Sequence, residues 1–296
     1  MRAAEIAKVL GGRRHGHQFM AKCPAHHDGT PSLAIRDSAS GKILLFCHGG
    51  CEQSAVIAAL RKAGLWDTTD RHVQLRVVDD RFDADDATRR TAALKIWNET
   101  TRASGTPVDV YLRARGIVLP IPPSIRFHNH LPHHPTGTAW PCMVSLIVDV
   151  NGAPVAIHRI WLALDGKGKA PIVPAKMTLG SCRHGAVRLG EIKAGETLAI
   201  SEGVETGLSV AQACRMPVWA ALSADGVKNV RLPQQATAIV LCADHDANGV
   251  GEAAAKAARK RLLREGRRVR IAMPTDVGDD FNDLLLKPKE SNRHVG

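Results

Sequence analysis

The residues best suited to chemistry are carboxylates placed directly after apolar runs. Glu202 follows the run TLAIS, and Asp244 and Asp246 follow AIVLCA. Such runs, separated by helix-like segments, are typical of parallel strands, whose carboxyl ends share the edge where ligands bind. Carboxylates gathered there repel one another, so the cluster persists best around a divalent cation such as Mg²⁺. We predict that Glu202, Asp244 and Asp246 hold Mg²⁺ or Mn²⁺ and are catalytic.

Other acids extend this hypothesis. Asp280 and Asp283, in the stretch DDFNDLLL, are predicted to hold a second ion or an outer-shell water. Two roles stay open for Glu205, because an acid at this position either favours the start of the following helix or joins the metal cluster. For the whole acidic group, the alternative is a purely structural role at strand ends and helix starts.

A second candidate site is a set of soft ligands in two close pairs with the pattern C-x2-H and C-x3-C: Cys23, His26, Cys47 and Cys51. Two such pairs on turns, separated by enough chain for a hairpin, can meet tetrahedrally around Zn²⁺. His27 and His48 are neighbouring alternatives for the histidine ligand. The competing interpretation is that these are free cysteines in a basic loop. An odd total of seven cysteines argues against a disulfide framework.

The surrounding pattern predicts the elements that position these residues. A helical run begins near residue 87 and includes TAALKIWNETTRA, and MVSLIVDV and PVAIHRIWLAL form a hairpin around Asn151-Gly152. The proline-rich segment 117–137 is expected to be irregular surface. From residue 191 four apolar strands alternate with helices, which indicates parallel pairing through crossovers. The fold class is therefore α/β.

The order of motifs resembles the Toprim fold shared by DnaG-type primases, topoisomerases and some nucleases: an E-G pair after one strand, D-x-D after a second, then a further acidic stretch. Among these proteins the zinc pattern favours the primases, since CPAHHDGTPSLAI resembles the zinc-binding opening of bacterial and phage primases. The segment VYLRARGI, followed by IRFH, is similar to the start of the primase polymerase core. The sequence departs from that family in its C-x3-C spacing and in Thr206, where an Asp is common.

The resemblance implies a DNA primase that synthesises short RNA primers on single-stranded DNA by metal-dependent nucleotidyl transfer. It implies structural Zn²⁺ and catalytic Mg²⁺ or Mn²⁺. The expected domains are a zinc-ribbon-like module (1–68), a charged linker (69–86), a mixed α+β N-terminal subdomain of the polymerase core (87–190) and a Toprim domain with a mainly parallel sheet (191–290).

Basic residues before the acidic clusters are candidates for binding template and nucleoside triphosphates: Arg113, Arg115, Arg159, Lys169 and Lys176. The alternative is a solvated basic loop. The formal net charge of +11 also favours an anionic macromolecule as partner. Neither a signal peptide nor a membrane-spanning run is evident, so we expect a cytoplasmic protein with no membrane partner.

No G-x4-G-K-[ST] motif occurs, and we expect no helicase-contacting domain after Leu286. We therefore expect any replicative helicase to be a separate protein. Two other functions stay open. One is a Toprim-type metal-dependent nuclease, and the other is a non-catalytic DNA-binding replication protein of a phage or other mobile element.

Overall fold

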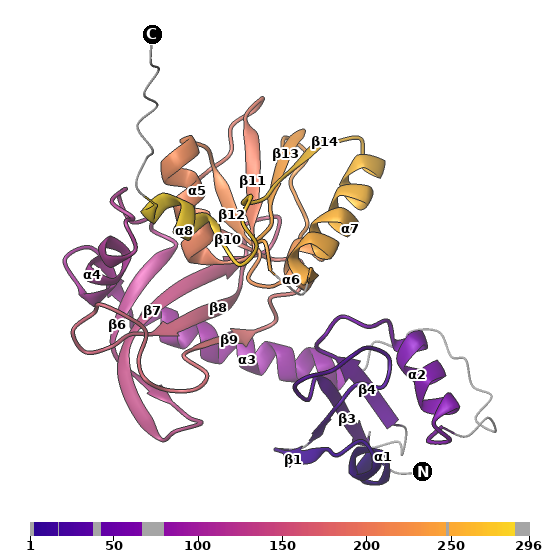
Figure 1. Cartoon of the computed structure of the whole chain (residues 1–296). Helices are drawn as coiled ribbons and strands as arrows, with labels where there is room; N and C mark the ends of the chain where they lie inside the picture. The colour runs from indigo at the N-terminus through magenta and orange to yellow at the C-terminus, as the bar shows by residue number, and fades with distance from the viewer. Residues whose placement is uncertain (1–2, 17, 38–42, 67–79, 247–248, 288–296) are drawn as a thin grey trace. The chain divides into compact units, whose positions relative to one another are not determined.

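The computed structural model describes residues 3–16, 18–37, 43–66, 80–246 and 249–287 (Figure 1). The chain forms two compact units, Met1–Val77 and Val78–Gly296, which are described separately. Most of the predicted linker 69–86 lies outside the described residues, and its last part begins helix α3 at Asp80. Within the described ranges, no helix has both the length and the apolar sequence that a bilayer span requires.

The first unit is a four-stranded antiparallel sheet, in the order β1-β2-β3-β4, with two helices. Its elements are α1 (Ala3–Val9), β1 (Arg13–His15), β2 (Gln18–Ala21), β3 (Leu33–Asp37), β4 (Ile43–Cys47) and α2 (Gln53–Lys62). Alternation along β3 turns Leu33 and Ile35 into a core that also contains Ile6 of α1 and Leu60 of α2. The unit thus has a core of its own.

The second unit begins with a five-stranded antiparallel sheet, in the order β5-β6-β7-β8-β9. Its elements are α3 (Asp80–Asn98), β5 (Thr101–Arg102), α4 (Pro107–Ala114), β6 (Ile125–His133), β7 (Thr138–Val148), β8 (Pro154–Trp161) and β9 (Lys176–Gly180). Thr106 caps α4 by accepting a hydrogen bond from the amide of Val108, and Pro107 occupies the first turn, where its missing N–H costs nothing.

A second sheet follows, in the order β10-β12-β11-β13-β14, and only β10 runs antiparallel to its neighbour. Its strands are β10 (Val187–Arg188), β11 (Thr197–Ser201), β12 (Val218–Ala220), β13 (Ala238–Cys242) and β14 (Arg268–Ala272). The helices are α5 (Val204–Cys214), α6 (Ala224–Asn229), α7 (Val250–Arg264) and α8 (Phe281–Leu286). Figure 1 shows α5 and α7 on opposite sides of this sheet.

Side-chain alternation explains how the two sheets join into one unit. In β11, Leu198 and Ile200 face a core that contains Leu262 of α7. Ala199 faces the other side, in a core that it shares with α5 and with Met143 of β7. The far face of the first sheet is covered by α3, with residues such as Trp161 of β8 packed in between. The first sheet and the second sheet therefore share one continuous core.

The predicted α/β class, the hairpin and the mainly parallel sheet are confirmed. The expectation of irregular structure over residues 117–137 is wrong, because this segment contains β6. Ile125 and Phe127 pack into the core that the two sheets share. A shift of register between His128 and Leu131 turns Leu131 to the opposite face, into the core under α3. The intervening histidines and prolines hide this alternation in the sequence.

Candidate functional site

Strand register places the first two predicted catalytic acids at one edge of the second sheet. Strands β11 and β13 are adjacent and parallel, and Ser201 at the end of β11 pairs with Cys242 at the end of β13. Glu202 is the next residue after β11, and Asp244 follows β13 by two residues. The carboxyl ends of parallel strands form the edge where ligands bind in such sheets. The sheet thus brings together two acids that lie far apart in the sequence.

The electrostatics of Asp244 show how closely the acids are grouped. Burial and the nearby charges of Glu202, Asp280 and Asp246 raise the pKa of Asp244 to about 7. Burial, followed by the charge of Asp246, likewise raises the pKa of Glu202. Lys176, at the start of β9, opposes both shifts, so its positive charge lies near this edge. Each carboxylate makes it harder for its neighbours to ionise.

One oxygen at this edge has no protein partner. Asp244 Oδ1 is buried and makes no hydrogen bond, whereas buried polar atoms are almost always paired. A hard divalent cation would satisfy this oxygen and neutralise the surrounding carboxylates, so the donor set fits Mg²⁺ or Mn²⁺. Among the described residues, however, the acidic oxygens do not form a cluster as tight as that of the cysteines and histidine described below.

The third acidic stretch has a visible structural role. Asp280 is the N-cap of α8 and accepts hydrogen bonds from the amides of Asn282 and Asp283, at 2.7 and 2.9 Å. Asp283 completes a capping box, because its carboxylate accepts from the Asp280 amide at 2.9 Å. Asp280 is half-buried and its charge reaches Asp244, while Asp283 is exposed. The predicted ion-binding role of these two acids stays a prediction, with Asp280 the better placed.

The side-chain contacts of Glu205 are with basic and hydroxyl groups and not with Glu202, Asp244 or Asp246. Its carboxylate accepts a hydrogen bond from the Tyr111 hydroxyl at 2.9 Å and forms an ion pair with Lys169 at 3.3 Å. Lys169, Tyr111 and Arg115 favour its ionised form and keep its pKa low despite burial. Nearby His158 is buried on β8, and desolvation lowers its pKa to about 4, so it is neutral near pH 7.

The predicted arginines occupy three different settings. Arg113 is exposed and pairs with Asp109 on the same helix at 2.9 Å. Arg115 is half-buried, and its Nε donates to the Tyr111 hydroxyl at 3.1 Å. Arg159 lies on the opposite face of β8 from His158, 6% exposed, with its guanidinium 5.0 Å from the centre of the Trp161 ring. This buried position does not favour the predicted contact of Arg159 with nucleic acid.

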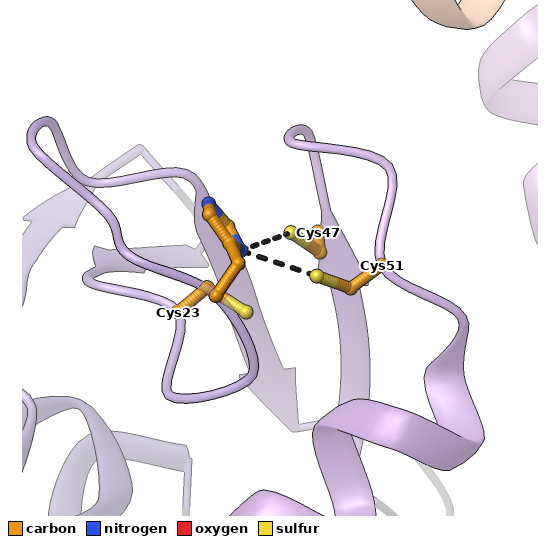
Figure 2. A group of neighbouring side chains, drawn as sticks. Cys23, Cys47 and Cys51 are labelled. Atoms are coloured by element: carbon orange, nitrogen blue, oxygen red, sulfur yellow. Dashed lines mark hydrogen bonds between the residues drawn. The ribbon is translucent and has the colours of Figure 1, made fainter. Parts of the chain in front are cut away.

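The first unit brings the four predicted zinc ligands together. One ligand atom from each of Cys23, His26, Cys47 and Cys51 lies within 4.8 Å of the others. His26 Nδ1 is 3.1 Å from Cys51 Sγ and 3.8 Å from Cys47 Sγ. Figure 2 shows the three sulfur atoms turned toward one another. This Cys3His set could bind zinc, because it supplies four soft or borderline ligands in a compact group.

Asp28 supports this group and was not anticipated from the sequence. Its carboxylate accepts from the amide of Cys23 at 2.6 Å and from the Ser32 hydroxyl at 2.7 Å. Its other oxygen lies 3.6 Å from His26 Nε2, so it can orient the ring whose Nδ1 faces the sulfurs. A β-carbon on Gly49 would lie 2.8 Å from the His26 ring, which explains a glycine there.

Of the two alternative histidines, His27 is exposed, and His48 packs edge-on against Phe46 at a centroid distance of 4.8 Å.

Tyr111 is the other residue that sequence reasoning did not assign a role. The signal was present, since it is the single tyrosine of the sequence and opens the motif YLRARG. Its partner Glu205 is 94 residues away, so only the fold reveals the contact.

Comparison with known protein families and structures gives the following matches. Residues 87–189 match a domain of unknown function (DUF7146), and residues 197–290 match the Toprim domain. No curated protein sequence matched the chain.

Several solved structures are similar to this chain. A DNA primase domain from Pseudomonas aeruginosa is 17% identical, with 68% of this chain and 74% of that chain covered and a TM-score of 0.44. The zinc-binding and RNA polymerase domains of the Aquifex aeolicus primase are 15% identical, with 97% and 80% covered and a TM-score of 0.40.

The primase fragment of the bacteriophage T7 primase-helicase is 16% identical, with 88% of this chain and 90% of that chain covered and a TM-score of 0.42. The match of residues 197–290 confirms the C-terminal part of the resemblance predicted from the sequence. The matched segment contains four of the predicted acids: Glu202, Asp244, Asp246 and Asp280.

Proposed function

We propose that this protein is a DNA primase-like nucleotidyltransferase that makes short RNA primers on single-stranded DNA. The observation that carries the proposal is the edge of the second sheet, where Glu202 and Asp244 follow adjacent parallel strands and Asp244 keeps an unpaired, buried oxygen. The Cys3His group of the first unit supports it, since a zinc module that precedes a Toprim domain in the sequence is the combination predicted above.

Each group has a role in this proposal. Glu202, Asp244 and Asp246 would hold the divalent cation, which supplies charge neutralisation at the triphosphate and activates the attacking hydroxyl. The charge of Lys176 acts on both Glu202 and Asp244, and a cation near these acids favours binding of phosphate oxygens. The 3′-hydroxyl of one nucleotide would lose its proton to solvent and bond the α-phosphorus of the next, while the bond to pyrophosphate breaks and pyrophosphate leaves. Asp280, whose charge acts on Asp244, would hold a second ion or an outer-shell water.

The proposed partners are single-stranded DNA and nucleoside triphosphates. The high positive charge of the chain suits a polyanionic template. Structural zinc in the first unit, a separate helicase and a cytoplasmic location remain parts of the same proposal.

The test is synthesis of labelled dinucleotides and longer products from a mixed-sequence single strand with Mg²⁺ or Mn²⁺. We expect Asp244→Asn to lower product formation by roughly 100-fold or more, because it removes a charge that would hold the cation, while zinc content is unchanged. Glu252→Gln is a matched control, since Glu252 is an exposed acid on the first turn of α7 that pairs with Lys256 at 2.7 Å.

The same reaction separates the alternatives. Shortening of the DNA in a metal-dependent manner, without consumption of ribonucleotides, would identify a nuclease that uses the same acids. Tight binding of DNA with neither synthesis nor cleavage would identify a non-catalytic replication protein. Full primer synthesis by Asp244→Asn would refute the assignment of the acidic edge.

A further inference from the structure

Glu205 is held by side chains from the first sheet and its flanking segments. It is the second residue of α5, three residues after Glu202, and its side chain is 13% exposed. A single oxygen, Oε1, accepts from the Tyr111 hydroxyl at 2.9 Å and lies 3.3 Å from Lys169 Nζ. Both partners come from the part of the chain before the Toprim domain. The contact therefore joins the two halves of the second unit beside the acidic edge.

Tyr111 is itself fixed by a second set of contacts. It is 1% exposed, and its hydroxyl accepts from Arg115 Nε at 3.1 Å while it donates to Glu205. The guanidinium of Arg115 also donates to Asn282 Oδ1 at 2.9 Å, and Asn282 Nδ2 donates to the Ser209 hydroxyl at 3.0 Å. Because Asn282 is 1% exposed, this chain of hydrogen bonds ties α4, α5 and α8 together with little access for water.

Lys169 is a cation of this network that a ligand can reach. Its side chain is 33% exposed, whereas its partner Glu205 is largely enclosed. An ion pair of this kind restricts a long, flexible side chain that would otherwise sample many rotamers. Lys176 is near enough for its charge to lower the pKa of Asp244, and both lysines act on the pKa of His158. A fixed Lys169 would add a second cation for an anionic ligand.

We propose that Glu205 is a positioning residue, whose carboxylate, fixed by Tyr111, holds the Lys169 ammonium where it binds the triphosphate of the nucleotide substrate. This inference rests on the proposed function of the neighbouring acids. It assigns Glu205 a different task from Glu202, which would hold the cation directly. Tyr111 and Arg115 act on the nucleotide only through Glu205 and Lys169.

Two binding measurements on the full chain test this assignment. Mn²⁺ titration followed by electron paramagnetic resonance reports the cation, and a fluorescent ATP analogue reports the nucleotide. For Glu205→Gln we expect nucleotide affinity to fall roughly tenfold, since a charge-assisted contact is lost, with Mn²⁺ affinity unchanged. For Glu202→Gln we expect the Mn²⁺ affinity to fall. Tyr111→Phe should weaken nucleotide binding in the same direction as Glu205→Gln, by a smaller factor.

A double-mutant cycle separates positioning from a general loss of stability. If Glu205 acts through Lys169, the double variant Lys169→Ala/Glu205→Gln binds nucleotide no more weakly than Lys169→Ala alone. Thr100→Val is the control, because it removes another enclosed hydroxyl that donates to a backbone carbonyl, at Trp97, outside this network. It should leave both affinities unchanged.

Two outcomes would overturn the inference. One is a fall in Mn²⁺ affinity for Glu205→Gln as large as that for Glu202→Gln, which would make Glu205 a ligand of the ion. The other is full additivity of Glu205→Gln and Lys169→Ala. Failure of the proposed function has a different signature, namely unchanged Mn²⁺ binding and unchanged primer synthesis in Glu202→Gln.

Discussion

At the scale of single residues, Asp244 combines burial with repulsion from like charges. Both effects favour the protonated carboxyl, and together they raise its pKa from the ordinary value of 3.8 to about 7. A group whose pKa is higher in the folded state stabilises the fold fully below its unfolded pKa, and loses that contribution as the pH rises through the folded pKa. The relevant window therefore extends from about pH 4 to about pH 7.

The raised pKa of Asp244 leads to a prediction for the metal-free protein. Between pH 5 and pH 8 the free energy of unfolding should fall by roughly 1 to 3 kcal/mol through Asp244. In Asp244→Asn that part of the fall should disappear, because the amide does not titrate. Urea denaturation of both proteins at the two pH values, in chelator, measures the difference. An identical pH dependence in the two proteins would show that Asp244 ionises normally.

The positions of residues could be predicted where one general rule sufficed, while the catalytic role of the acids stays a prediction. Glu202 and Asp244 could be predicted as neighbours, since acids after adjacent parallel strands meet at one edge of the sheet. The roles of Asp28 and Tyr111 could not be predicted. Each depends on the geometry of a folded contact, and that between Tyr111 and Glu205 spans 94 residues.

At the scale of elements, α8 shows how a local motif and a site can share the same acids. Asp280 and Asp283 form a reciprocal capping box at the start of α8. A sequence of acids reads equally well as a cap or as a metal site, because both need exposed carboxylate oxygens. Only the side-chain directions separate the two roles.

The two acids of this box should respond differently to substitution. Asp283→Ala should lower the free energy of unfolding by about 0.5 to 1 kcal/mol through loss of one capping bond, with Mn²⁺ affinity unchanged. Asp280→Ala should cost about 1 kcal/mol or more as the N-cap and should also weaken Mn²⁺ binding, since its charge reaches Asp244. Denaturation and Mn²⁺ titration measure the two effects. Weaker Mn²⁺ binding in Asp283→Ala would instead indicate that Asp283 is a ligand of the ion.

Elements were predictable where apolar alternation is uninterrupted. The strands β11 and β13 are short apolar runs, and β7 and β8 flank an Asn-Gly turn, so all four follow from the sequence. Strand β6 does not, because its bulge between His128 and Leu131 breaks the period of two and Pro132 lies near its end. The two-residue strand β10 is too short to produce a pattern.

At the scale of the whole molecule, the two units differ in what stabilises them. The second unit has a core that continues from the first sheet into the second, with Met143 and Ala199 in one cluster. The first unit has a small separate core around Leu33, Ile35 and Leu60, beside the Cys3His group. A core of this size gives limited stability, and small modules commonly depend on a metal for the remainder.

Removal of zinc should therefore unfold the first unit and leave the second intact. In reduced protein, a zinc chelator should abolish hydrogen-exchange protection of the amides of β3 and β4, as should Cys47→Ser without chelator. Protection in β7, β8 and β11 should be unchanged, since their shared core contains no residue of the first unit. Mass spectrometry of exchanged peptides, with zinc measured in parallel, resolves both units in one experiment. Loss of protection in both units would mean that zinc stabilises the chain as a single cooperative structure, because the folding of one unit would then depend on the other.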